Sequence, residues 1–215
     1  EDAVAAALTA QAPDAAQYAI TKLQEALEKY EFPLLLAAEW GHADRLLTLL
    51  DSPDTSQARK LKIMSLLGDM QADEAMPKLK EALKDRDLAR QALAAIGNLG
   101  RDGIPLLVEM MNTSPQLEVQ AAAAKSLGQI GGLHGDASVV LPLLAKLQDP
   151  KTDWTVLTEV AWSLGKIPDK RSIQPLYDLD KKLQAIRDPD NMTLKKLKEA
   201  VFWSIKQCDT WDQYS

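Results

Sequence analysis

The chain has 215 residues, of which 46% are hydrophobic, 26% are charged and 5% are aromatic, and its formal net charge is −6. Its single cysteine, Cys208, excludes an intramolecular disulfide framework, and no uncharged apolar stretch approaches the roughly 18–20 residues that a membrane-spanning helix needs. The helix formers Ala, Leu, Lys, Glu and Gln dominate, and β-branched runs of alternating polarity are absent, so the sequence favours an all-α fold.

Residues 1–57 carry the net negative charge. They hold ten acidic residues against three basic ones, whereas residues 58–215 hold 21 against 22. Apolar residues at helical spacing predict a helix over 14–30, a short apolar helix after Pro33 and a further helix over 43–50. We interpret this segment as a degenerate N-terminal cap, because terminal repeats are atypical and present a polar face to water. Its acidity either keeps the array soluble or forms a docking end for a basic partner.

A short motif recurs from residue 58 onward. Its copies are Leu67-Gly68, Ile96-Gly97, Leu127-Gly128, Leu164-Gly165 and, in decayed form, Ile205-Lys206. The marker positions 68, 97, 128, 165 and 206 are separated by 29, 31, 37 and 41 residues. A period of this length is typical of a helical repeat array, in which function lies on an extended surface rather than in a catalytic pocket.

Each glycine-marked helix is followed by a second helix that a proline is expected to open, since the missing N–H of proline would be unpaired in the first turn anyway. The prolines are Pro77, Pro105, Pro142 and Pro175. We expect the marker glycine, or Lys166-Ile167-Pro168 in the fourth copy, to end the preceding helix. Tight helix–helix contacts are expected at five small residues: Ala92, Ala95, Ala123, Ala124 and Ala161.

This pattern resembles HEAT-like repeats, and more narrowly the short repeats named after phycobilisome lyases. The resemblance covers about 58–209 and implies a right-handed α-solenoid of helical hairpins. It divides the chain into acidic N-terminal capping helices over 1–57, four repeats over 58–191 and a C-terminal capping helix with a tail over 192–215.

One column departs from the family pattern. Repeats of this family tend to carry an arginine eight residues before the glycine, which forms a ladder with a loop aspartate. The residues in that column here are Lys60, Ala89, Gln120 and Leu157. We therefore expect the packing of small residues, rather than this ionic ladder, to hold neighbouring repeats together.

Residues suited to catalysis or metal binding are scarce. The histidines His42 and His134 are far apart and neither is followed by glutamate, so we assign no catalytic residue and no metal ligand. The glycine-rich run 131–136 lacks the Lys-Ser/Thr of a phosphate-binding loop, and we interpret it as a lengthened turn rather than a ligand loop. Cys208 is interpreted as a small buried hydrophobe rather than a redox or bilin-attachment thiol.

Tryptophans provide the strongest functional signal. The column three residues before the marker reads Ser65, Ala94, Lys125, Trp162 and Trp203. In the family this column usually faces solvent on the concave side, so two successive repeats place an indole where a partner could bind it. Alternatively, the C-terminal cap covers both rings. The candidate partner-binding residues are Trp162, Trp203, Trp154, Arg90, Lys125, Glu159 and Glu199.

We therefore expect a non-catalytic protein-binding scaffold, adaptor or assembly factor that uses the concave face and needs no cofactor. The resemblance alone implies an alternative, a subunit of a phycobilin lyase or a chromophore-handling chaperone, which would bind a bilin. The expected partner is another protein, as in a hetero-oligomer. Nucleic acid is not expected because a basic stripe is missing, and membrane insertion is not expected either. No signal peptide is visible, which favours the cytoplasm, or the plastid stroma if a transit peptide has been removed.

Overall fold

The computed structural model describes residues 32–39 and 41–214, and all the regular elements in this part of the chain are helical. The α-helices are α3 (Phe32–Glu39), α4 (Ala43–Asp51), α5 (Gln57–Asp69), α6 (Met76–Ala82), α7 (Arg86–Leu99), α8 (Ile104–Thr113), α9 (Leu117–His134), α10 (Val140–Gln148), α11 (Trp154–Lys166), α12 (Lys170–Gln184) and α13 (Met192–Tyr214). Short 3-10 turns precede three of them: η1 (Asp73–Ala75), η2 (Arg101–Gly103) and η3 (Ala137–Val139). The predicted helix over 14–30 lies outside the described residues, and the division into two caps and four repeats stays a prediction.

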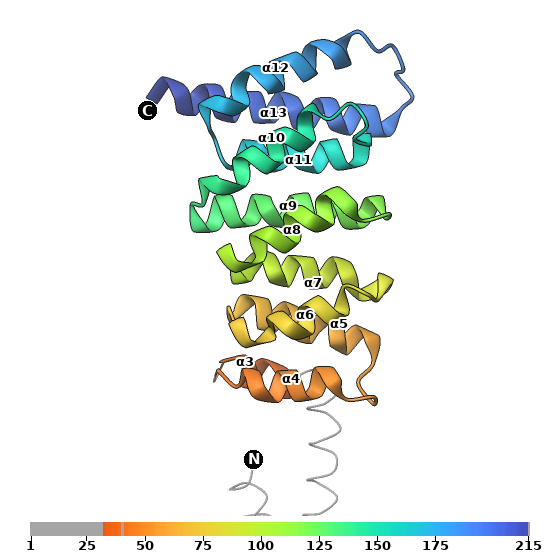
Figure 1. Ribbon diagram of the computed structural model, residues 1–215, viewed down its shortest axis with the longest axis vertical. Coiled ribbons are helices and arrows are strands. Elements are labelled where there is room, and N and C mark those ends of the chain that lie inside the picture. Colours follow the sequence, from red (N-terminus) through yellow and green to blue (C-terminus); the bar gives the residue numbers. More distant parts are fainter. Residues whose placement is uncertain (1–31, 40, 215) are drawn as a thin grey trace, which may run out of the picture.

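The helices form two layers (Figure 1). The glycine-marked helices α5, α7, α9, α11 and α13 pack on one another in chain order, and we call them the inner layer. The proline-containing helices α6, α8, α10 and α12 form the outer layer, and each packs mainly on the inner helix that follows it. The fold is therefore the all-α helical solenoid that the repeat pattern predicts.

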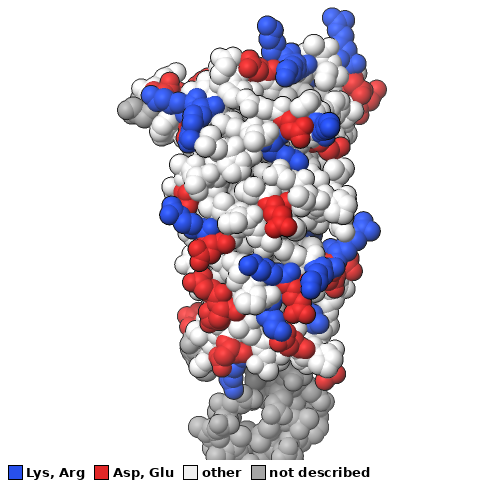
Figure 2. All heavy atoms as spheres, viewed as in Figure 1, with Lys and Arg blue, Asp and Glu red and all other residues white. Residues whose placement is uncertain are grey.

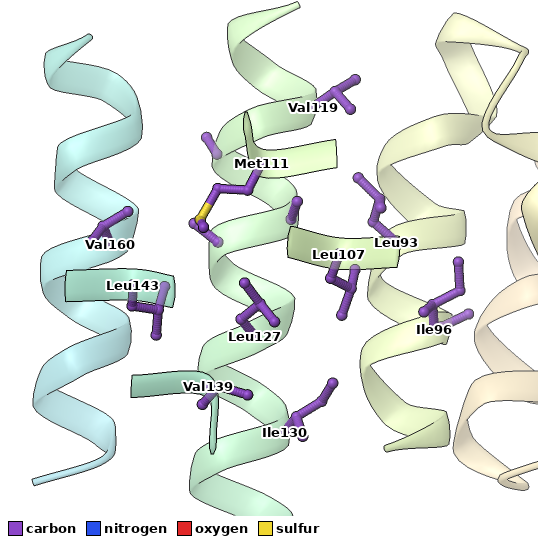
Figure 3. Packing of buried hydrophobic residues seen from close by; sticks show 14 of the residues in the cluster. Leu93, Ile96, Leu107, Met111, Val119, Leu127, Ile130, Val139, Leu143 and Val160 are labelled. Carbon is purple, nitrogen blue, oxygen red and sulfur yellow. The ribbon is translucent and has the colours of Figure 1, made fainter. Parts of the chain in front are cut away.

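The hydrophobic core lies between the two layers. Leu107 and Met111 of α8 are fully buried and lie between α7 and α9, where Leu93 and Leu127 face them (Figure 3). Leu143 of α10 occupies the corresponding place between α9 and α11 (Figure 3). Burying one such side chain contributes about 1.5–3 kcal/mol to folding, so each outer helix joins the two inner helices next to it.

The marker glycines lie inside their helices and do not end them, so the prediction that they stop these helices is wrong. The stop predicted at Lys166-Ile167-Pro168 is confirmed, because α11 ends at Lys166 and Ile167 is its C-cap. Helix α9 passes through Gly128 and continues to His134. The run 131–134, which was expected to belong to a lengthened turn, is the last turn of this helix. The inner helices α5, α7 and α9 instead end one or two residues before a residue with positive φ, which is Gln71, Gly100 or Gly135, respectively.

Glycine is needed at the marker positions because the next inner helix lies directly against them. A Cβ atom at Gly68 would lie 2.8 Å from the Cα atom of Ala95, and one at Gly97 would lie 2.9 Å from the Cβ atom of Ser126. Both contacted residues stand two positions before the next marker, so the stack keeps one register. The five alanines predicted at tight contacts are confirmed as buried: Ala92, Ala95, Ala123, Ala124 and Ala161.

The prolines open three of the four outer helices. Pro77, Pro105 and Pro142 lie in the first turns of α6, α8 and α10, as predicted. The prediction is wrong for Pro175, which lies inside α12. That helix begins five residues earlier, because the Asp169 carboxylate accepts a hydrogen bond of 2.9 Å from the backbone N–H of Arg171 and thereby caps it.

A matched pair of glycine substitutions in α9 tests the inner register. Gly128 lies against Ser163 of α11, and a Cβ atom there would overlap the serine, so we expect Gly128→Ala to lower the free energy of unfolding by about 1–3 kcal/mol. A Cβ at the exposed Gly132 would lie 3.6 Å from the Lys166 carbonyl oxygen, an ordinary contact. Gly132→Ala should therefore raise the free energy of unfolding by about 0.5–1 kcal/mol, because alanine has the higher helix propensity. Urea unfolding of both variants measures this, and equal effects would contradict the register.

The end of α5 supports a second stability prediction. Gln71 has a φ of 52°, and the hydrogen bonds from its N–H to the Gly68 carbonyl (3.0 Å) and from the Ala72 N–H to the Leu67 carbonyl (3.1 Å) form a Schellman motif. Glycine adopts this conformation without strain, so Gln71→Gly should raise the free energy of unfolding by about 1 kcal/mol. Gln71→Ala is the control, because it removes the same side chain and keeps the strained backbone. A gain for alanine equal to that for glycine would show that backbone strain is not the cause.

Candidate functional site

The candidate site was predicted on the concave face, which the glycine-marked helices of the inner layer were expected to line. The register of the glycines brings Lys125 of α9, Trp162 of α11 and Trp203 of α13 to successive positions along the exposed side of this layer. Lys125 is exposed, and both tryptophans are partly buried. The two rings are thus neither fully exposed nor fully covered.

Trp162 and Trp203 contact each other. Their ring centroids are 4.9 Å apart and the ring planes are inclined by 49°. The six-membered ring of Trp203 also lies over Gly165, since a Cβ atom at that glycine would come 2.5 Å from the Cζ3 atom of the indole. Aromatic pairs in tilted geometry are favourable by about 0.5–1.5 kcal/mol beyond their burial. The pair is therefore held in one arrangement and still presents part of its surface to solvent.

Two of the predicted residues, Trp154 and Glu199, lie at the margin of this region. Trp154 is the first residue of α11, partly buried, and its carbonyl accepts a hydrogen bond of 2.7 Å from the Thr158 hydroxyl. Glu199 is exposed on α13, one turn before Trp203. Neither residue lines the hollow of the inner layer that contains the other predicted charged residues.

The remaining predicted residues, Arg90, Lys125 and Glu159, meet in a hollow of about 420 Å³ between α7, α9 and α11. We call this hollow the alanine hollow, because short side chains contributed by α7 and α9 line it. The residues that line it are Arg90, Gln91, Ala94, Glu118, Ala121, Ala122, Lys125, Ser126, Gln129, Thr155 and Glu159. Glu118, Ala121 and Ala122 were not predicted from the sequence. Glu118 lies ten residues before the marker, and reading that column along the repeats would have found it.

A second hollow, of about 460 Å³, lies at the turns that follow α5, α7 and α9, and residues 134–136 contribute to it. Arg101 Nε donates a hydrogen bond of 2.7 Å to the Asp136 carboxylate, which also accepts one of 3.0 Å from the Ser138 N–H. These hydrogen bonds, first that from Ser138 and then that from Arg101, hold the pKa of Asp136 at about 2, below the usual 3.8. The buried carboxylate thus pairs with the Arg101 guanidinium and caps η3, which gives this turn a structural role.

Other reactive groups are isolated in the described part of the chain. Cys208 is fully buried, as predicted, and burial raises the pKa of its thiol. Within residues 32–39 and 41–214, no three His, Cys, Asp or Glu side chains are grouped so that they could hold a metal ion. None of the described helices is both long and apolar enough to cross a bilayer.

The exposed apolar side chains of the outer layer are scattered. On the face shown in Figure 2, acidic and basic residues are interspersed, and the part over α8 and α10 is largely uncharged. On α10, Leu141 is 58% exposed. On α12, Tyr177 is 44% exposed, and its hydroxyl donates a hydrogen bond of 2.6 Å to Asp209 of α13. Single exposed apolar residues of this kind are normal for a protein surface.

The Asp136 cap predicts a pH dependence of stability. A folded-state pKa below the unfolded one means that the carboxylate stabilises the protein above about pH 4, and that this contribution is lost as the pH falls through about 2. Asp136→Asn should therefore lower the melting temperature at pH 6, and the difference from wild type should shrink between pH 4 and pH 2. Asp102→Asn, at an exposed position in η2, is the control. A difference between wild type and Asp136→Asn that does not vary with pH would contradict the assignment.

Two family models match the chain. The model for HEAT repeats matches residues 84–150, which comprise α7 to α10, and the model for the PBS lyase HEAT-like repeat matches residues 156–180, within α11 and α12. No curated protein matches the chain at a significant level. The matched segments coincide with the helices that surround the alanine hollow and with the helix that carries Trp162. Residues 84–150 are thus similar to HEAT repeats, and residues 156–180 are similar to the PBS lyase HEAT-like repeat.

Proposed function

We propose that the protein is a non-catalytic scaffold or adaptor that binds another protein through the exposed side of its inner layer. The observation that carries the proposal is the Trp162–Trp203 pair, which is tilted, in contact and partly exposed on two successive inner helices. HEAT repeats generally mediate protein interactions, and tryptophan is enriched among the residues that dominate binding energies.

The surroundings of the pair support this function. Lys125 precedes the two indoles in the same surface column, and Glu199 lies one turn before Trp203. Interface hot spots are typically aromatic anchors with a polar rim that excludes water. Because the rings rest on Gly165 and on each other, they lose little further freedom when a partner binds.

The alternative, a subunit that handles a bilin chromophore, rests on the similarity of residues 156–180 to PBS lyase repeats. The buried Cys208 does not supply an accessible thiol for a chromophore. Absorbance of the protein purified after co-expression in a bilin-producing host separates the two functions. The scaffold function predicts a colourless protein, and a visible band retained through purification would favour the chromophore function instead.

The binding face is tested by substitution of the tryptophan pair. Wild type and the double variant Trp162→Ala, Trp203→Ala serve as baits in extracts of the source cells, and each partner recovered is then purified and titrated. We expect the double variant to weaken binding by about 2 kcal/mol or more, which is roughly 30-fold in Kd. Because both rings are partly buried, the variant should also melt at a lower temperature, so binding is measured well below that temperature.

Leu141→Ala is the matched control, since it truncates an exposed apolar side chain on the outer layer. The proposal requires that this variant bind the partner as wild type does. A partner that is lost with Leu141→Ala and retained by the double tryptophan variant would move the binding face to the outer layer and overturn the proposal. Recovery of the same partners with wild type, the double tryptophan variant and Leu141→Ala would also overturn the proposal.

A further inference from the structure

The alanine hollow exists because α7 and α9 have short side chains at neighbouring positions. Ala121 and Ala122 of α9 form its floor together with Ala94 of α7. At neighbouring positions of the flanking helices stand Arg90 of α7 and Glu159 of α11. The volume of about 420 Å³ falls in the lower part of the range of ligand sites, which is about 300–1,000 Å³. The floor therefore offers apolar surface for one large side chain.

Four charged residues surround this floor in a fixed arrangement of basic and acidic groups. Glu118 and Lys125 are seven residues apart on α9, which is about 10 Å along a helix, and Arg90 and Glu159 stand on the two flanking helices. One half of the rim is basic (Arg90 and Lys125), and the other half is acidic (Glu118 and Glu159). No ion pair joins any of the four to another residue of the described chain. The charges are thus available to a ligand.

We propose that the alanine hollow is a second subsite for the partner protein, and that it takes a segment in which one large apolar side chain lies between an acidic and a basic residue. The apolar side chain covers the alanines, the acidic residue faces Arg90 and Lys125, and the basic residue faces Glu118 and Glu159. This inference rests on the proposed function, because it assumes a protein ligand. It adds the chemistry by which the partner is recognised.

The complementarity of charge favours this occupant over others. A nucleic-acid backbone would bring phosphates against two glutamates, and a purely apolar ligand would leave four charges without partners. Charge pairs at an exposed rim determine specificity and orientation more than affinity, whereas the buried anchor supplies most of the binding energy. The segment should thus depend on its apolar residue for affinity and on its flanking charges for selection.

Methyl NMR of the full chain with ¹³C-labelled alanine tests the subsite without a known partner. The probe is an acetylated, amidated heptapeptide with two glutamates, glycine, leucine, glycine and two lysines in that order. At about 5 mM, a concentration suited to a Kd near 1 mM, it should shift the methyl signals of Ala94, Ala121 and Ala122. The methyl of Ala145, exposed on the outer layer, is the internal reference and should not move.

Matched peptides test the two parts of the proposed chemistry. Replacing the leucine by serine should weaken binding roughly tenfold, since the anchor is lost. Peptides with only glutamates or only lysines around the leucine should also bind less tightly than the mixed peptide. Equal shifts with all four peptides, or no shift of the three floor methyls with the mixed peptide, would overturn the proposal.

Variants of the rim and of the floor complete the test. The double variant Glu118→Lys, Glu159→Lys makes the whole rim basic, so its preference should change from the mixed to the all-glutamate peptide. Ala122→Phe fills the floor and should abolish the shifts of Ala94 and Ala121. Melting temperatures close to wild type show that the variants are folded. An unchanged peptide preference in the folded rim variant would contradict the assignment of charges.

This experiment can fail independently of the proposed function. The tryptophans do not line the alanine hollow, so Trp162→Ala should leave the peptide shifts intact. If the floor methyls do not respond to the peptides while the double tryptophan variant loses its partner, the scaffold function stands and the second subsite is wrong. If the methyls respond and the double tryptophan variant retains its partner, the tryptophan face is wrong and the subsite stands.

Discussion

The contact between each marker glycine and the following inner helix is the constraint on which the rest of the structure depends. Gly68, Gly97 and Gly128 lie so close to the next helix that a methyl group would overlap it. The last two inner contacts add a hydrogen bond. Ser163 donates one of 2.9 Å to the Ala124 carbonyl, and Ser204 donates one of 2.7 Å to the Ala161 carbonyl. Most buried hydroxyls are hydrogen-bonded, so these two contacts favour one register as well as one spacing.

The residues that the marker glycines contact differ along the array. Gly165 meets both Ser204 and the indole of Trp203, where the earlier glycines meet Ala95, Ser126 or Ser163. On α13 the marker position is Lys206, whose ammonium lies 4.8 Å from the ring centroid of the exposed Phe202. The groove of small residues that receives an inner helix is therefore replaced on α13 by a cation–π pair. The tryptophan pair also belongs to this end of the array, because Trp203, which is larger than alanine or serine, lies over Gly165.

The period of the repeat was enough to predict the helices and the alanines that became buried, because both follow from spacing along one chain. It did not reveal why glycine marks the repeat, since both a helix end and a close helix contact favour glycine. Gln71 supplies the left-handed residue after α5, where a sequence reading expects glycine or asparagine. The surface column of Lys125, Trp162 and Trp203 could be read from the sequence. The alanine hollow could not, because it depends on the lengths of side chains on three neighbouring helices.

The geometry of the inner layer also limits what a partner must look like. Packed helices lie about 8–10 Å apart, so the path from Arg90 on α7 to Trp203 on α13 crosses three helix spacings, or about 24–30 Å. An extended segment covers that path with about eight or nine residues, and an α-helix needs about 16–20. Trp162 and Glu159 stand three residues apart on α11, which is about 4.5 Å along the helix, so the aromatic pair and the charged hollow share one rigid element. A single partner segment that extends from Arg90 to Trp203 therefore runs across the inner helices, along the axis of the array, rather than parallel to any one helix.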